Sequence, residues 1–164
     1  MSDNSSSHER YMRRCIELAR GALVSNDAPV GALVVLNDVI LGEGVESVKA
    51  RQDVTAHAEI EALRAACEVV GSTDLTGSTL YTSVEPCVMC AYAIRLARVS
   101  LVVTGSRSSH SHVSLSGWAV LVTSDALRDR PVPVTIRNVM PQERPSALSS
   151  RKTKAASRRR RKKG

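Results

Sequence analysis

Apolar positions recur at helical spacing near the start of the chain, and Ser6 and Glu9 just before them have the spacing of a capping box. This pattern predicts a first helix with one apolar stripe. The stripe consists of Met12, Ile16, Ala19 and Leu23. Two runs rich in valine and leucine follow at residues 30–36 and 39–45, and the dipeptide Asn37-Asp38 between them suits a two-residue hairpin.

The rest of the apolar pattern alternates between helices and strands. Thr55 can cap a helix over residues 56–70. Its expected core-facing residues are Ile60, Leu63, Cys67 and Val70. Pro86 is expected to begin a third helix, as a first-turn proline does. A fourth helix is expected at residues 118–127, and further strands at residues 79–84, 99–104 and 133–139. The alternation predicts an α/β fold, a three-layer α/β/α sandwich with a partly parallel sheet and its last strand at an edge.

The composition indicates one folded domain with a charged appendage. The 164 residues are 43% hydrophobic but contain no apolar stretch near the ~18 residues of a membrane-spanning helix, so we expect no membrane protein. The polar N-terminus lacks a secretory pattern, which favours the cytoplasm, where four cysteines suggest metal or redox chemistry. Residues 151–164 hold nine of the 23 lysines and arginines and no acid. We therefore expect a domain over residues 1–145 and a basic, disordered tail over residues 146–164.

Two short motifs carry candidate chemistry, His57-Ala58-Glu59 and Pro86-Cys87-Val88-Met89-Cys90. Cys87 and Cys90 are three residues apart at the start of a predicted helix, so their sulfurs can share one ion. The helix N-terminus also favours thiolates. With His57 as a third ligand, zinc would keep its fourth tetrahedral position open for water, as catalytic sites do.

Glu59 lies two residues from His57 and could stand beside the metal without coordinating it. A carboxylate there can take a proton from zinc-bound water and later give it to a ring nitrogen and to a departing amine. The sequence therefore predicts Zn²⁺ as the cofactor and Glu59 as the catalytic acid and base. The predicted reaction is hydrolytic deamination of an amino-substituted aromatic ring.

Taken together, the motifs resemble the cytidine-deaminase-like superfamily, whose zinc deaminases pair His-x-Glu with Pro-Cys-x-x-Cys. The resemblance extends from Tyr11 to Gly105 and is closest to the branch of tRNA adenosine, guanine and cytosine deaminases. The matching segments are Pro29-Val30-Gly31-Ala32, Thr55-Ala56-His57-Ala58-Glu59-Ile60, Leu80-Tyr81-Thr82 and Glu85-Pro86-Cys87-Val88-Met89-Cys90. The resemblance implies a five-stranded mixed sheet between helices, zinc held between the second and third helices, and a homodimer or higher homo-oligomer.

The chain departs from the resembled family where relatives usually carry a substrate-binding asparagine, because that position is Glu46. An ionised glutamate only accepts hydrogen bonds, so a ring with extra N–H donors would suit it. The alternative interpretation of Glu46 is a solvated loop carboxylate. Other candidate substrate contacts are Pro86 and the backbone near Ala58. Trp118, with His110 nearby, could form a lid over the ring; the alternative is a Trp118 packed against the sheet.

Nothing from Pro131 onward matches the C-terminal helix with which tRNA-acting members grip the anticodon loop, and the chain has few aromatic residues for base stacking. We therefore expect a small substrate: a free nucleobase such as guanine or cytosine, a nucleoside, or a triazine-like analogue. The second interpretation is a tRNA wobble-adenosine deaminase that binds nucleic acid through its basic tail. The third is a noncatalytic zinc scaffold, against which the uncoordinated Glu59 argues.

Overall fold

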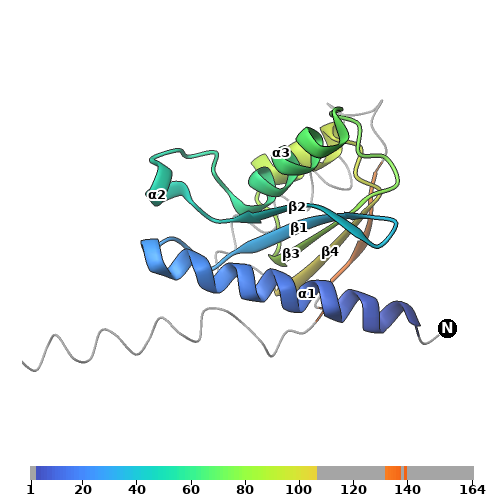
Figure 1. Cartoon of the computed structure of the whole chain (residues 1–164), viewed down its shortest axis with the longest axis horizontal. Helices are drawn as coiled ribbons and strands as arrows, with labels where there is room; N and C mark the ends of the chain where they lie inside the picture. Colours follow the sequence, from blue (N-terminus) through green and yellow to red (C-terminus); the bar gives the residue numbers. More distant parts are fainter. Residues whose placement is uncertain (1–2, 107–131, 138, 140–164) are drawn as a thin grey trace, which may run out of the picture.

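The computed structural model describes residues 3–106, 132–137 and 139 (Figure 1). Five strands form one mixed sheet in the order β2–β1–β3–β4–β5. Strand β1 (Gly31–Leu36) pairs antiparallel with β2 (Val39–Val45) and with β3 (Thr79–Val84). Strands β4 (Leu101–Ser106) and β5 (Val134–Ile136) continue the sheet in parallel with β3. The expected five-stranded mixed sheet, with its last strand at an edge, is confirmed.

Helices cover both faces of this sheet (Figure 1). Helix α1 (Asp3–Ala22), continued by the short 3₁₀ helix η1 (Leu23–Ser25), lies along one face. Helices α3 (Ala58–Val70) and α4 (Val88–Leu96) pack on the other face, and α2 (Val48–Arg51) is a single turn between β2 and α3. Each face has its own apolar core. The three-layer α/β/α sandwich is therefore confirmed.

The helices begin at residues other than the expected ones. Helix α1 starts at Asp3, so Ser6 lies inside it and does not cap it. Helix α3 starts at Ala58 with His57 at the N-cap. The Asp53 carboxylate accepts hydrogen bonds from both the N–H (2.8 Å) and the hydroxyl (2.7 Å) of Thr55, which holds Thr55 in a turn ahead of the helix. Helix α4 starts at Val88, which places Pro86 ahead of the helix. The predicted starts of these three helices, at the Ser6 cap, at residue 56 and at Pro86, are therefore wrong.

Small residues line the core side of α3, in place of most of the larger ones that the sequence pattern predicted. Leu63 is buried as expected, but Ile60 and Cys67 are half-buried and Val70 is exposed. The fully buried positions are instead those of three alanines and one glutamate. They are Ala58, Glu59, Ala62 and Ala66.

The reason for this small-residue face lies in β2. A Cβ at Gly44 would press into the carbonyl oxygen of Ala58 and lie 2.5 Å from the Ala62 nitrogen, and one at Gly42 would lie 2.5 Å from backbone atoms of Ala62 and Ala66. Helix α3 therefore packs backbone to backbone on β2, at a distance that only glycine in the strand allows.

Asn37 and Asp38 form the predicted two-residue turn between β1 and β2. Both residues have positive φ values, 51° and 64°, as a type I′ hairpin turn requires. Among the described residues, no helix has the length and apolarity needed to cross a membrane. The helix predicted at 118–127 and the tail at 146–164 lie outside the described residues.

The close approach of α3 to β2 generates a prediction about Gly44. Replacement by alanine is expected to lower the free energy of unfolding by about 1–3 kcal/mol or more, because the added methyl group meets backbone atoms that cannot move aside separately. The matched control is Gly21→Ala in α1, where a Cβ meets nothing within 4 Å and stability should stay equal or rise. Urea unfolding of both variants provides the measurement, and an unchanged Gly44→Ala would contradict this packing.

Candidate metal centre and active site

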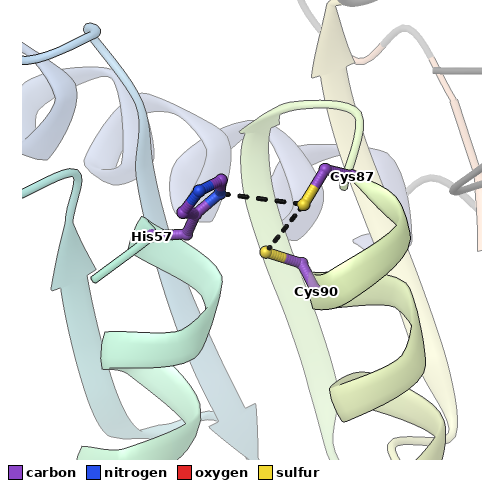
Figure 2. Close-up of side chains that lie close together, drawn as sticks. All are labelled: His57, Cys87 and Cys90. Carbon is purple, nitrogen blue, oxygen red and sulfur yellow. Dashed lines mark hydrogen bonds between the residues drawn. The ribbon is translucent and has the colours of Figure 1, made fainter. Parts of the chain in front are cut away.

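The three residues proposed as metal ligands come together at the starts of two helices (Figure 2). His57 is the N-cap of α3, Cys87 is the N-cap of α4, and Cys90 follows in the first turn of α4. The Nδ1 atom of His57 lies 3.7 Å from the sulfur of Cys87, which lies 3.6 Å from the sulfur of Cys90. All three donor atoms lie within 4.8 Å of one another.

These separations fit one tetrahedral zinc ion. With zinc bonds of about 2.3 Å to sulfur and about 2.0–2.1 Å to nitrogen, tetrahedral angles separate two sulfurs by about 3.8 Å and a sulfur from a nitrogen by about 3.6 Å. The observed 3.6 Å and 3.7 Å agree with both values. One imidazole and two thiols are also the donor types that zinc prefers.

The electrostatics of the three residues favour cation binding. Hydrogen bonds, first from Cys90 and then from His57, lower the pKa of the Cys87 thiol to about 4 despite its burial. The hydrogen bond with Cys87 raises the pKa of His57 to about 9. The pKa of Cys90 is raised, first by its hydrogen bond with Cys87 and then by burial. The lowered pKa of Cys87 favours its thiolate form, and the negative charge of a thiolate attracts a divalent cation.

Glu59 lies on the buried side of the first turn of α3, 3% exposed. Burial, and after it the charge of Cys87, raises the pKa of its carboxyl to about 7, and the charge of Glu59 in turn raises the pKa of Cys90. The Thr82 hydroxyl, from β3, lies 3.1 Å from its Oε1 atom. A buried carboxyl with a raised pKa beside a metal-binding group is typical of a proton-transferring residue.

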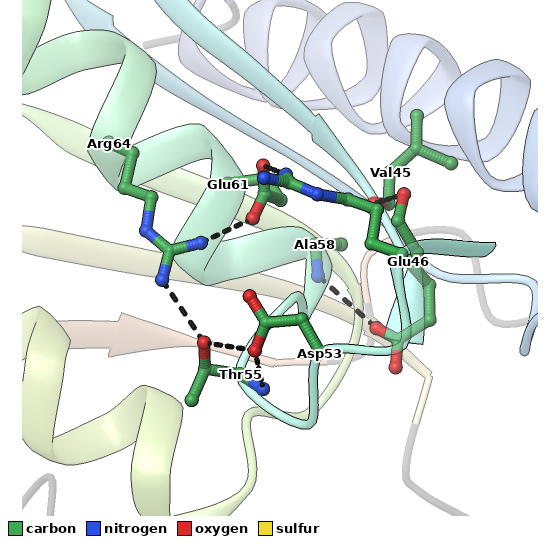
Figure 3. Close-up of polar contacts among 9 residues, drawn as sticks. Val45, Glu46, Asp53, Thr55, Ala58, Glu61 and Arg64 are labelled. Carbon is green, nitrogen blue, oxygen red and sulfur yellow. Dashed lines mark hydrogen bonds and ion pairs between the residues drawn. The ribbon is translucent and has the colours of Figure 1, made fainter. Parts of the chain in front are cut away.

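Glu46 directly follows β2 and lies close enough to His57 for their charges to interact. Its side chain is buried, and burial raises its pKa. The backbone N–H of Ala58 donates a hydrogen bond to Glu46 Oε2 at 3.2 Å (Figure 3). The N–H that was expected to steady a substrate ring is thus engaged by Glu46, which caps α3 from outside the helix.

The other predicted substrate contacts have different outcomes. Pro86 is fully buried and directly precedes Cys87, so it lies at the edge of the metal-binding group. Trp118 and His110 lie outside the described residues, and their proposed lid remains a prediction.

Sequence reasoning missed the polar contacts that hold the segment between Glu46 and His57 in place (Figure 3). Arg64 of α3 donates hydrogen bonds to the Thr55 hydroxyl at 3.1 Å and to Glu61 Oε1 at 2.6 Å. The second oxygen of Glu61 accepts a hydrogen bond from Arg51 at the end of α2. Because Thr55 is bound to Asp53 in turn, the residues from the end of α2 to Thr55 are tied at two points to the first two turns of α3.

Asp27 holds the same segment in place through hydrogen bonds to α2. Its carboxylate accepts hydrogen bonds from the backbone N–H groups of Lys49 (2.6 Å) and Ala50 (3.1 Å) and from the Ser25 hydroxyl (3.0 Å). Burial acts to raise the pKa of Asp27, but these hydrogen bonds prevail and lower it. No local sequence pattern reveals the contact of Asp27 with α2, because Lys49 and Ala50 follow some twenty residues later in the chain.

Three donor atoms at zinc-binding separations, with a buried carboxyl left uncoordinated beside them, define the class of zinc-dependent deaminases. Comparison with known families leads to the same class. Residues 5–106 match the family described as the cytidine and deoxycytidylate deaminase zinc-binding region. The chain belongs to this family, and zinc is its cofactor.

Similar proteins with named activities include a guanine deaminase and a tRNA-specific adenosine deaminase. Guanine deaminase of Bacillus subtilis (strain 168) is 43% identical over 96 residues, which cover 58% of this chain and 62% of that protein, less than two thirds of its length. A tRNA-specific adenosine deaminase of Agrobacterium fabrum is 36% identical over 107 residues, 65% of this chain and 70% of that protein.

Solved structures of both these kinds are also similar to this chain. One from a study of A-to-I editing by tRNA:A34 deaminases superposes with a TM-score of 0.74 at 28% identity, covering 85% of this chain and 99% of the other. Guanine deaminase of Bacillus subtilis superposes with a TM-score of 0.61 at 38% identity, covering 64% and 68%. The predicted superfamily and branch are confirmed. Because both activities occur among the relatives, the substrate ring has to be inferred from the residues around the site.

Proposed function

We propose that this protein is a zinc-dependent hydrolytic deaminase of a small amino-heterocycle, which it converts to a carbonyl compound with release of ammonia. The candidate substrates are a free nucleobase such as guanine or cytosine, a nucleoside, or a triazine-like analogue. The observation that carries the proposed reaction is the buried Glu59 carboxyl beside the His57, Cys87 and Cys90 side chains.

In the proposed mechanism, His57, Cys87 and Cys90 hold the zinc ion, which, when bound, acts as a Lewis acid that makes water nucleophilic at neutral pH. The Glu59 carboxylate takes a proton from the attacking water and delivers it to a ring nitrogen. It then takes the remaining proton from the hydroxyl now bonded to the ring carbon and gives it to the departing amine, so that a carbonyl forms and ammonia leaves. Burial of Glu59 keeps these protons from bulk water.

The choice of a small ring with N–H donors is supported by Glu46. Its carboxylate is buried beside His57 and is held in place by the Ala58 N–H. An acceptor fixed at that position would bind an exocyclic amino group or a ring N–H of the substrate, and would disfavour a carbonyl. Pro86 would contribute to the pocket wall, and Trp118 with His110 would cover the ring.

The second candidate function is deamination of the wobble adenosine of tRNA. It is supported by the similarity to a tRNA deaminase structure and by the nine basic residues at 151–164, which could bind RNA phosphates. In either case we propose that residues 1–145 form the deaminase domain, with residues 146–164 as its appendage. A reducing cytoplasm suits the free thiols of Cys87 and Cys90.

The proposed reaction is tested by ammonia release from a panel of free bases, nucleosides and aminotriazines, alongside inosine formation in tRNA. The protein loaded with one zinc per chain is expected to turn over at least one small ring. Glu59→Gln should lower that rate by about 10²–10⁴-fold while keeping its zinc, because the variant removes the proton carrier alone. Cys90→Ser should lose the zinc.

The matched control is Glu68→Gln, the same change on the exposed side of α3. Activity that survives in Glu59→Gln would refute the mechanism. Inosine formation without any small-ring turnover would establish the second candidate function, and bound zinc without any turnover would establish the scaffold.

The role of Glu46 is tested by Glu46→Gln, which keeps an acceptor for the Ala58 N–H but adds N–H donors toward the substrate. The ratio of kcat/KM between amino-bearing rings and carbonyl-bearing rings is expected to fall about 10-fold or more, as for loss of a hydrogen bond to a charged group. Glu43→Gln is the control, because Glu43 pairs with Arg14 of α1 (2.7 Å), on the other side of the sheet. An unchanged ratio would assign Glu46 to capping alone.

We further propose that the protein forms a homodimer through α3 and α4. A groove of about 520 Å³ between these helices is lined mainly by apolar side chains, and the same two helices carry exposed large apolar residues. They include Val69, Val70, Val88, Tyr92 and Leu96. A second copy of the chain would bury this surface.

Leu96→Glu is expected to convert the dimer to monomers, because it places a charge on the proposed interface. The molecular mass in solution, measured by sedimentation or light scattering, provides the test. The control is Val24→Glu in η1, where the side chain is 90% exposed and far from the groove in sequence. A monomeric wild type, or a dimeric Leu96→Glu, would contradict the proposed interface.

A further inference from the structure

Thr82 occupies the centre of the sheet directly beneath the proposed catalytic residue. It belongs to β3, which has β1 on one side and β4 on the other. Its backbone pairs with Ala32 of β1 and with Thr104 of β4, and the residue is fully buried. Two ladders therefore fix its backbone, and the side chain points toward α3, where Glu59 lies.

The Thr82 hydroxyl has two partners within hydrogen-bond distance. Its Oγ1 atom lies 2.9 Å from the carbonyl oxygen of Val84 and 3.1 Å from Oε1 of Glu59. A hydroxyl carries one hydrogen and two lone pairs, so it donates to one partner at a time and can accept from the other. The Val84 carbonyl only accepts, whereas a carboxyl accepts without its proton and donates with it.

We propose that Thr82 is a positioning residue that binds Glu59 both with and without the proton that the reaction transfers. This inference rests on the proposed role of Glu59. When Glu59 carries no proton, the Thr82 hydroxyl donates to Oε1. When Glu59 carries the proton, its O–H donates to Oγ1, and the Thr82 hydroxyl turns to donate to Val84.

This arrangement keeps the carboxyl in one place through the reaction cycle. Glu59 is 3% exposed, so water cannot readily replace a missing partner on its sheet side. A threonine can satisfy both forms without moving any heavy atom, because only its hydroxyl hydrogen rotates. Valine at this position would have the same shape but no hydrogen-bonding atom, so the Glu59 carboxyl would lose its Thr82 partner and be held less firmly in the productive position.

The test compares Thr82→Val with Thr82→Ser, which keeps the hydroxyl. Thr82→Val is expected to lower kcat about 10–100-fold, as for other residues that orient a catalytic group, with KM changed less than about twofold. Thr82→Ser should recover most of the lost kcat. Zinc content should match that of the wild type in both variants, and both should remain folded at the assay temperature. Thr82→Ala paired with Thr82→Ser gives the same comparison if the valine variant does not fold.

Thr104→Val is the matched control, because Thr104 is the buried cross-strand neighbour of Thr82. Its hydroxyl has no hydrogen-bond partner among the described residues, so the same change there should leave kcat unaltered. A kcat that falls equally in Thr104→Val would assign the effect of Thr82→Val to general packing and would overturn the proposal.

A second readout does not depend on turnover. The side-chain carboxyl ¹³C resonance of Glu59, assigned by its loss in Glu59→Gln, is expected to shift in Thr82→Val and to keep its position in Thr104→Val. An unshifted resonance, or an undiminished kcat, in Thr82→Val would overturn the role of Thr82. A wild type that turns over no substrate would instead overturn the proposed function, while the resonance would still report whether Thr82 holds Glu59.

Discussion

The contact of α3 with β2 sets the geometry on which the site depends. Gly42 and Gly44 let the helix backbone rest directly on the strand, and the alanines of α3 fill the contact without holding the helix away. Because the helix lies so close to the sheet, Glu59 in its first turn reaches Thr82 on β3. His57, at the N-cap of the same helix, then faces Cys87 at the N-cap of α4.

Two helix N-termini and three acidic side chains together determine the electrostatic potential at the site. The N-termini of α3 and α4 meet at the metal-binding group, and both helix dipoles favour negative charge there. Against this positive potential stand a thiolate at Cys87 and two buried carboxyls, Glu46 and Glu59, whose pKa values are both raised by burial. A divalent cation at the centre would offset the negative charges that the helix ends only partly compensate.

Much of this architecture could be predicted from the sequence, because its determinants are local. The strand patterns, the Asn37-Asp38 turn and the spacing of Cys87 and Cys90 each depend on residues close together in the chain. The residues on the core side of α3 could not be predicted from the apolar pattern of the helix itself. They are small because Gly42 and Gly44 of β2 let the helix backbone lie directly on the strand. Thr55 does not cap α3, because its N–H and hydroxyl both donate to the Asp53 carboxylate and hold Thr55 in a turn that ends before the helix begins. The proposed role of Thr82 depends on how α3 sits over β3, because Thr82 and Glu59 are 23 residues apart in the chain. A pattern of neighbouring residues cannot predict such a contact.

The hydrogen bond from the Ala58 N–H to Glu46 has a consequence for protein engineering. Selectivity redesign would naturally begin at position 46, but this side chain also completes the start of the helix that bears His57 and Glu59. Replacement by leucine or another purely aliphatic group would strip that amide of its acceptor and loosen the metal-binding end of the helix along with the pocket. Libraries at this position therefore have to be restricted to side chains that retain an oxygen able to reach the amide, such as asparagine, aspartate or glutamine.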